Sequence, residues 1–224
     1  MNGHDLERLR ASLPAVPGIQ GKSEYFNSVV LVLLALIDCE YHFVLQKRCA
    51  GIRQPGEICF PGGAYDAAHD SSLQATAIRE TVEELGIPAD RLRIVGVLDT
   101  VVAPMGATVD AFVGVTDIAS LDELVVSVHE VDEAFSVPVS YFEQREPRQY
   151  YTTLRIAPSY VDSETNEEVV TFPARELGLP ERYWQPWGGA KHPVYVYQVG
   201  SRVIWGLTAR LIIDVVRKLK QAQE

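Results

Sequence analysis

The sequence has 224 residues, 47% hydrophobic and 22% charged, which is enough to bury a core and suits one domain with insertions. Its net charge of −10 argues against a protein that binds nucleic acid without sequence preference, because such a protein needs a basic surface. The charge does not exclude a nucleotide substrate, which an acidic protein can hold through divalent cations and a local basic patch.

The cysteines and the apolar runs indicate the compartment. Cys39, Cys49 and Cys59 form no CxxC pair, so neither a disulfide framework nor a zinc site is indicated, and unpaired thiols suit a reducing compartment. Charged residues precede any apolar run at the N-terminus, which argues against a secretory signal, and Val29–Ile37 is too short to span a bilayer. We therefore expect a cytoplasmic protein that binds neither membrane nor nucleic acid.

The first elements are a helix and a hairpin. Asp5–Leu13 has the pattern of a short amphipathic helix, at about residues 4–13 of the chain. Ser28–Ile37 is a continuous apolar run, as in a strand covered on both faces, and Tyr41–Lys47 alternates as its antiparallel partner. A loop rich in glycine and proline follows at 48–63, with a short strand predicted at Glu57–Phe60.

Ser71–Leu85 is the strongest helix prediction in the sequence. Asp70 or Ser71 can cap its start, while Gly86 and Pro88 end it. After it, strands are predicted at Leu92–Val101 and Thr108–Val115, and a helical turn at Val131–Phe135.

The last third of the chain contains an insertion. Residues 144–191 are rich in aromatic residues, prolines and charges, with short strands predicted at Tyr150–Ile156 and Glu168–Phe172. A strand at Val194–Val199 and a helix at Val203–Lys220 complete the chain. Interleaved strands and helices predict an α+β fold with a mixed sheet, in a single domain that spans residues 1–224.

Three glutamates stand out on the predicted helix. At about 100° per residue, Glu84 lies about 40° to one side of Glu80 and Glu83 about 60° to the other, so the three carboxylates share one face. The opposite face is apolar and can pack on a sheet; it carries Ala75, Ile78, Val82 and Leu85. The acidic face is either a solvated surface or a site for hard divalent cations, which favour carboxylate oxygens.

The neighbouring residues favour the cation site. Arg79 adjoins Glu80 and can orient a carboxylate through a bidentate contact, although it can equally be a surface arginine. Upstream, Phe60-Pro61-Gly62-Gly63 forms a turn whose bare backbone can approach a metal or a phosphate closely.

Together these residues resemble the Nudix hydrolases, whose box reads G-x5-E-x7-R-E-U-x-E-E-x-G-U, with U a bulky apolar residue. Residues 79–87 match the second half, with Thr81 at the first U. The first half departs, because the spacing from Gly63 to Arg79 is two residues longer and Ser71 stands where the first glutamate would fall. The resemblance implies an α/β/α sandwich around a mixed sheet.

Residues 44–63 are similar to a narrower group, the coenzyme A pyrophosphatase branch. Its signature before the box is matched by Arg48, Arg53, Gly56, Glu57 and the Phe-Pro-Gly-Gly run. The match is one residue short and no histidine precedes Gly56. Ile204-Trp205-Gly206-Leu207-Thr208-Ala209 and Glu130-Val131 also resemble this branch.

The resemblance implies Mg²⁺- or Mn²⁺-dependent attack of water on a diphosphate within a small nucleotide-type substrate. Glu80, Glu83 and Glu84 would be the metal ligands, with the Gly63 carbonyl as a weaker candidate. The general base would be one of these glutamates or Glu130, which can equally be a surface residue.

Arg48 and Arg53 are candidates for contact with the substrate phosphates, unless they serve only solubility. The branch implies cleavage of coenzyme A or an acyl derivative to phosphopantetheine and adenosine 3′,5′-bisphosphate. The alternatives are ADP-ribose, a dinucleotide, or a sensor that binds nucleotides without turnover. The insertion carries tyrosines and tryptophans that suit either a substrate wall or the contact of a homodimer.

Overall fold

The computed structural model describes residues 3–222, and its centre is an eight-stranded mixed sheet with the path β3-β2-β1-β7-β5. The hairpin of β1 (Phe26–Ile37) and β2 (Glu40–Arg48) is antiparallel, and β1 runs parallel to β7 (Ala107–Thr116). The shorter strands are β3 (Ile58–Cys59), β4 (Gly62–Ala64), β5 (Leu92–Val97), β6 (Val101–Ala103) and β8 (Val131–Pro138).

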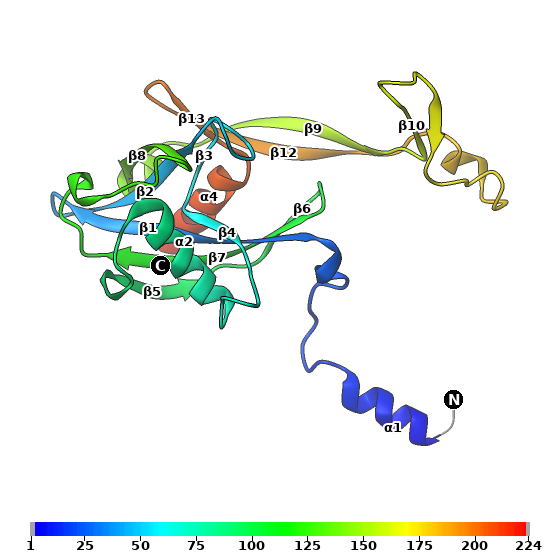
Figure 1. Ribbon diagram of the computed structural model, residues 1–224, viewed down its shortest axis with the longest axis horizontal. Coiled ribbons are helices and arrows are strands. Elements are labelled where there is room, and N and C mark those ends of the chain that lie inside the picture. The colour runs from blue at the N-terminus through cyan, green and yellow to red at the C-terminus, as the bar shows by residue number, and fades with distance from the viewer. Residues whose placement is uncertain (1–2, 223–224) are drawn as a thin grey trace.

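Helices cover both faces of this sheet, as Figure 1 shows. On one side α2 (Leu73–Leu85) packs on β1 through Ala77 and Leu85, against Leu31 and Leu33 of the strand. On the other side α3 (Val139–Glu143) and α4 (Gly206–Gln221) pack over Val32 and the neighbouring strands. Successive residues of β1 therefore enter opposite cores, which confirms the α/β/α architecture and the strand predicted to be covered on both faces.

A long arm leaves the sheet and is formed by residues 148–199 (Figure 1). Its strands β9 (Arg148–Ile156) and β12 (Trp187–Val199) pair antiparallel, and β13 (Arg202–Trp205) pairs with the inner end of β12. The far end carries a small hairpin of β10 (Ser159–Val161) and β11 (Glu168–Val170). The predicted insertion is thus mainly a two-stranded ribbon, and the predicted strand at Val194–Val199 is the inner end of β12.

The remaining helices are short or peripheral. Helix α1 (Gly3–Ser12) lies where a helix was predicted and stands apart from the sheet in Figure 1. Four single turns of 3-10 helix are η1 (Lys22–Glu24), η2 (Ala89–Arg91), η3 (Leu121–Glu123) and η4 (Glu181–Tyr183). Within residues 3–222, no helix combines the length and the apolar character that crossing a membrane requires.

Three predicted elements were wrong. Val131–Phe135 is not a helical turn but the start of β8, because Val131 and Phe135 are buried when that segment pairs with β2. The predicted helix at Val203–Lys220 begins only at Gly206, since residues 203–205 pair with β12. The predicted strand Leu92–Val101 is divided into β5 and β6, which pair with different parts of β7.

Candidate active site

The acidic helix α2 is fixed at both ends. Its N-cap is Ser72, whose side chain accepts a hydrogen bond from the Ala75 amide at 3.1 Å. The predicted caps, Asp70 and Ser71, were therefore wrong by one or two residues. At the other end, Gly86 adopts a left-handed conformation with φ of 69° and closes the helix onto the Val82 carbonyl.

Glu84 joins this helix to the glycine turn. The Gly62 amide donates a hydrogen bond to Glu84 Oε2 at 2.8 Å, and the glutamate is only 3% exposed. Burial raises the pKa of Glu84 to about 7, an effect that the Gly62 amide partly opposes. A Cβ at Gly62 would lie 2.2 Å from the Val29 carbonyl oxygen, so only glycine allows this close approach to β1.

Glu80 lies directly against Gly63. A Cβ at that glycine would come within 2.3 Å of Glu80 Oε1. Burial raises the pKa of Glu80, and the negative charges of Glu83 and Glu130 add to the effect, although Arg79 opposes it. The structure therefore brings the two glycines, Glu80 and Glu84 together, with Glu130 close enough to act on Glu80 electrostatically.

Arg79 connects the acidic groups. Its Nε and Nη2 donate to the two carboxylate oxygens of Asp70 at 2.8 and 2.9 Å. Its Nη1 lies 2.8 Å from Glu80 Oε1 and 2.9 Å from Glu83 Oε2. The guanidinium holds the pKa of the buried Asp70 well below its usual range, so both stay charged and Arg79 is fixed in place.

The prediction that three carboxylates share one face needs correction. Glu83 is exposed and Glu84 is buried, because the buried side of α2 includes Ala77 and Thr81, whose small side chains let the helix approach the sheet. Within the described part of the chain, no three His, Cys, Asp or Glu side chains already form a metal-ligand set. Glu80 and Glu83 point instead to Arg79.

The donor chemistry nevertheless fits a hard divalent cation. Asp70 already offsets the charge of Arg79 through two hydrogen bonds. The carboxylates of Glu80 and Glu84 are partly or fully buried, and burial raises the pKa of both. A cation bound beside them would relieve this desolvation and the mutual repulsion of Glu80 with Glu83 and Glu130.

The other predicted site residues are Arg48, Arg53 and Glu130, and their contacts differ. Arg48 ends β2, donates from Nε to the Arg53 carbonyl at 2.8 Å, and its charge lowers the pKa of Glu84. The Arg53 guanidinium stacks on the Phe26 ring, 4.5 Å from its centroid. Glu130 lies in the turn before β8, where its carbonyl accepts from the Cys49 amide at 2.9 Å.

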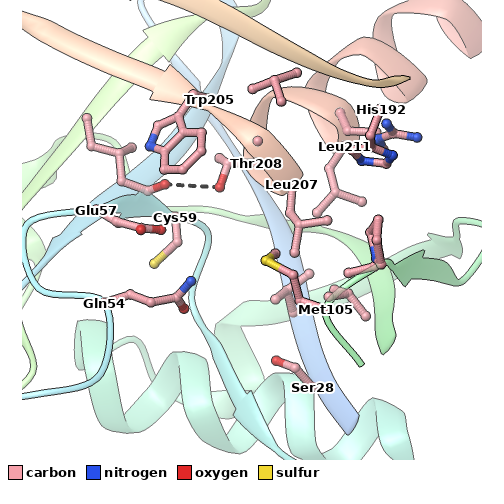
Figure 2. A pocket seen from close by; sticks show the side chains of 18 of the residues that line it. Ser28, Gln54, Glu57, Cys59, Met105, His192, Trp205, Leu207, Thr208 and Leu211 are labelled. Atoms are coloured by element: carbon pink, nitrogen blue, oxygen red, sulfur yellow. Dashed lines mark hydrogen bonds between the residues drawn. The ribbon is translucent and has the colours of Figure 1, made fainter. Parts of the chain in front are cut away.

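A largely apolar pocket of about 530 Å³ adjoins the cluster through Gly62 and Arg48. Figure 2 shows Leu207 and Leu211 of α4 facing Met105 across the pocket, with Cys59 and Glu57 toward one side. The inner part of the arm contributes further lining residues: Thr152, Thr153, Leu154, His192, Pro193 and Val194. Arg53 is not a lining residue. The size is that of a pocket for a small organic ligand.

Sequence reasoning missed two residues of the cluster. Asp70 was considered only as a helix cap, yet it adjoins Ser71, the position at which the family pattern has its first glutamate. A carboxylate one residue before the expected position was the signal in the sequence that could have pointed to Asp70. Gln46 is fully buried on β2, where its Nε2 donates to Cys59 Sγ at 3.9 Å, and it lowers the pKa of Glu84, but nothing in a single sequence pairs it with a residue 38 positions away.

The sequence is similar to a known family, to curated proteins and to solved structures. The family described as "NUDIX domain" matches residues 27–156. The uncharacterized Nudix hydrolase NudL of Yersinia enterocolitica is 30% identical over 193 residues, covering 83% of this chain and 79% of the relative. The peroxisomal coenzyme A diphosphatase NUDT7 of Mus musculus is 38% identical over 99 residues, covering 44% of this chain and 40% of that protein.

Other curated relatives are also matched over about half of their length. Among solved structures, the Nudix hydrolase RenU of M. smegmatis is 22% identical with a TM-score of 0.42, over 54% of this chain and 74% of that chain. Because the NUDIX domain match spans more than half of the sequence and contains the glycine turn, the acidic helix and Glu130, the chain belongs to the Nudix hydrolase family.

Proposed function

We propose that the protein is a Mg²⁺- or Mn²⁺-dependent pyrophosphohydrolase that cleaves coenzyme A or an acyl derivative of it. The products would be phosphopantetheine and adenosine 3′,5′-bisphosphate, formed by addition of one water across the diphosphate. The observation that carries the proposal is the position of Glu80 and Glu84 against Gly62 and Gly63, beside an apolar pocket.

The chain's own residues would divide the work. Glu80, Glu83 and Glu84, with the Gly63 carbonyl, would hold the metal, while Arg79 positions Glu80 and Glu83. A bound divalent cation would lower the pKa of an attacking water and stabilise charge on the phosphoryl oxygens. Glu130 is the candidate that would accept the proton of that water, because its negative charge acts on Glu80 while Arg79 forms its ion pairs with Asp70, Glu80 and Glu83.

The pocket favours coenzyme A among diphosphates. Its lining offers Met105, Leu207 and Leu211 to a flexible apolar chain, which matches a pantetheine arm or an acyl group better than a second ribose. Arg48, between the pocket and Glu84, suits contact with phosphate. One relative's name, coenzyme A diphosphatase, points the same way.

We also propose that the enzyme works in the cytoplasm. The cysteines Cys39, Cys49 and Cys59 are unpaired in the structure, which suits a reducing compartment.

A substrate panel tests the proposal. Purified protein is incubated with Mg²⁺ and coenzyme A, acetyl-coenzyme A, ADP-ribose or a dinucleoside polyphosphate, and the products are separated by chromatography. Release of phosphopantetheine with the highest kcat/KM on a coenzyme A compound is expected. A higher kcat/KM on ADP-ribose or a dinucleotide would reassign the substrate. Saturable binding without turnover of any compound would instead indicate a sensor.

A further inference from the structure

The arm exposes apolar side chains that the chain itself does not cover. Every residue of β9 is exposed, and the strand carries Tyr150, Tyr151, Leu154 and Ile156 on its two faces. Beyond the part that β13 reaches, β9 and β12 form a ribbon of only two strands (Figure 1). An isolated two-stranded ribbon is at best marginally stable in water, so the arm needs cover.

The exposed area is large enough for a stable interface. Eleven large hydrophobic side chains between residues 148 and 199 are exposed by 36% to 63%. At roughly 150–250 Å² for each aromatic side chain and less for each aliphatic one, they leave on the order of several hundred to 1,000 Å² of surface in water along the whole arm. A stable protein–protein interface buries about 800 Å² per partner, whereas the largest apolar patch of a typical monomer is roughly 300–600 Å².

The backbone of β9 points to the kind of partner. This strand is the last in the order β13-β12-β9, so its outer edge is unpaired over nine residues. It contains no proline, and Arg155 is the single charge after Arg148, so the edge lacks the usual protection against strand pairing. In a twofold dimer, the same strand from two copies meets antiparallel, which satisfies both edges at once.

Charge favours a second copy over a charged partner. Residues 148–199 contain five basic and six acidic side chains, a net charge of −1, while the whole chain carries −10. Two arms can therefore meet with little repulsion, although the rest of the surface is acidic. A nearly neutral arm offers no field to attract an anionic membrane or nucleic acid.

We propose that the arm is a dimerisation element, in which the edge of β9 pairs antiparallel with β9 of a second copy of this chain. The two three-stranded sheets would then join into one sheet across the twofold axis. Because Thr152, Leu154, His192 and Val194 line the pocket, the second copy would also fix the orientation of one pocket wall. The inference stands on the arm and does not rest on the proposed function.

The test is the mass of the full chain in solution, measured by light scattering and by sedimentation equilibrium over a concentration series. The expected value is twice 24.9 kDa. The double variant Tyr150→Lys/Ile156→Lys places charges on one exposed face of β9, outside the pocket lining. It should raise the dimer dissociation constant at least about 30-fold. The matched control, Val95→Lys/Val97→Lys, changes exposed apolar residues of β5 and should dimerise like the wild type.

Amide hydrogen exchange on the wild type gives a second reading that does not depend on a variant. Protection of β9 amides at high protein concentration, lost on dilution, is expected. A wild type that stays monomeric over the whole series, or an arm variant that dimerises as well as the control, overturns the proposal. A monomer that sediments with phosphatidylcholine and phosphatidylserine vesicles would overturn it too, and would assign the arm to a membrane surface.

Discussion

Arg79 has more than one carboxylate partner, and the geometry separates their roles. Asp70 is buried and accepts from two guanidinium nitrogens, and it also accepts from the Thr76 hydroxyl at 3.0 Å and from the Asp66 amide at 3.1 Å. Glu80 and Glu83 share the remaining nitrogen. Asp70 therefore positions the arginine, and the arginine in turn places the two glutamates.

Asp70→Asn tests this positioning. The substitution leaves Arg79 partly buried without its paired charge, so the midpoint of thermal unfolding at pH 7 should fall by roughly 5–10 °C. The pKa of Asp70 is depressed in the fold, so the pair's stability is fully present above the unfolded value and is lost as pH falls toward the folded value. Thermal melts should therefore show the difference from wild type narrowing below about pH 4.

The exposed pair of Arg91 and Asp117 supplies the control. Their Nε–Oδ1 distance is 2.6 Å, but the Asp117 side chain is 74% exposed. Asp117→Asn should shift the melting midpoint by less than about 2 °C, because solvent screens such pairs. Equal losses for Asp70→Asn and Asp117→Asn would contradict the positioning role.

Gly63→Ala separates function from folding. The added Cβ would meet the flexible carboxylate of Glu80, not backbone, so the carboxylate shifts while the fold tolerates the change. We expect a change in unfolding free energy under about 1 kcal/mol but a loss of at least about 10-fold in metal affinity and kcat/KM. Gly96→Ala, where nothing lies within 4 Å of the added Cβ, should leave both unchanged. If Gly63→Ala kept the metal affinity and kcat/KM of the wild type, Gly63 would not belong to the active site.

At this scale the sequence predicted that Glu80, Glu83 and Glu84 are near neighbours on one helix and that Arg79 can contact a carboxylate beside it, because i,i+3 and i,i+4 residues on a helix lie close together. It did not predict that Glu84 is buried while Glu83 is exposed. That difference depends on which side of α2 faces β1, and the small side chains of Ala77 and Thr81 decide it.

At the scale of elements, α2 must be held in register with the glycine turn. Ser72→Ala removes the side chain that accepts from the Ala75 amide and should lower the free energy of unfolding by about 1 kcal/mol in urea denaturation. Ser71→Ala changes the neighbouring exposed serine and should have no comparable effect. If Ser71→Ala were the more destabilising change, Ser72 would not be the cap.

Local patterns predicted elements that pair with near neighbours in sequence, such as the β1–β2 hairpin. They failed for β8, whose short segment becomes a strand because a distant partner accepts it: Phe135 pairs with Leu45. They also missed β13, which forms a tight hairpin with β12 and has Arg202 opposite Val199. Residues of these types occur in helices and strands alike, so tertiary pairing decides their structure.

For the whole molecule, a net charge of −10 makes cation binding a source of stability. A ligand present at about 100 times its Kd and bound only by the folded state adds about 2.7 kcal/mol. Thermal melts with Mg²⁺ or Mn²⁺ should therefore shift upward, and a Glu80→Gln variant should lose most of the shift. An equal shift in both proteins would place the cation elsewhere.

The sequence did not predict that β9 and β12 form a long arm extending from the sheet. The arm depends on β9 pairing with β12, for example Thr152 with His192, across a segment of some forty residues without a strong pattern. The two-layer cover of the sheet was predictable, because β1 is apolar on both faces.

We infer that Glu80, Glu83 and Glu84 bind the divalent cation that activates water for cleavage of the diphosphate. The most direct test of this inference is phosphopantetheine release from coenzyme A by wild type and Glu83→Gln, titrated with Mg²⁺ and reversed with EDTA. Glu83 is 53% exposed, so its replacement spares the fold, and the exposed Glu164→Gln is the control. A loss of about 10²–10⁴-fold in kcat for Glu83→Gln alone is predicted. Undiminished turnover by Glu83→Gln at saturating metal and substrate, or turnover that survives EDTA, would contradict the account.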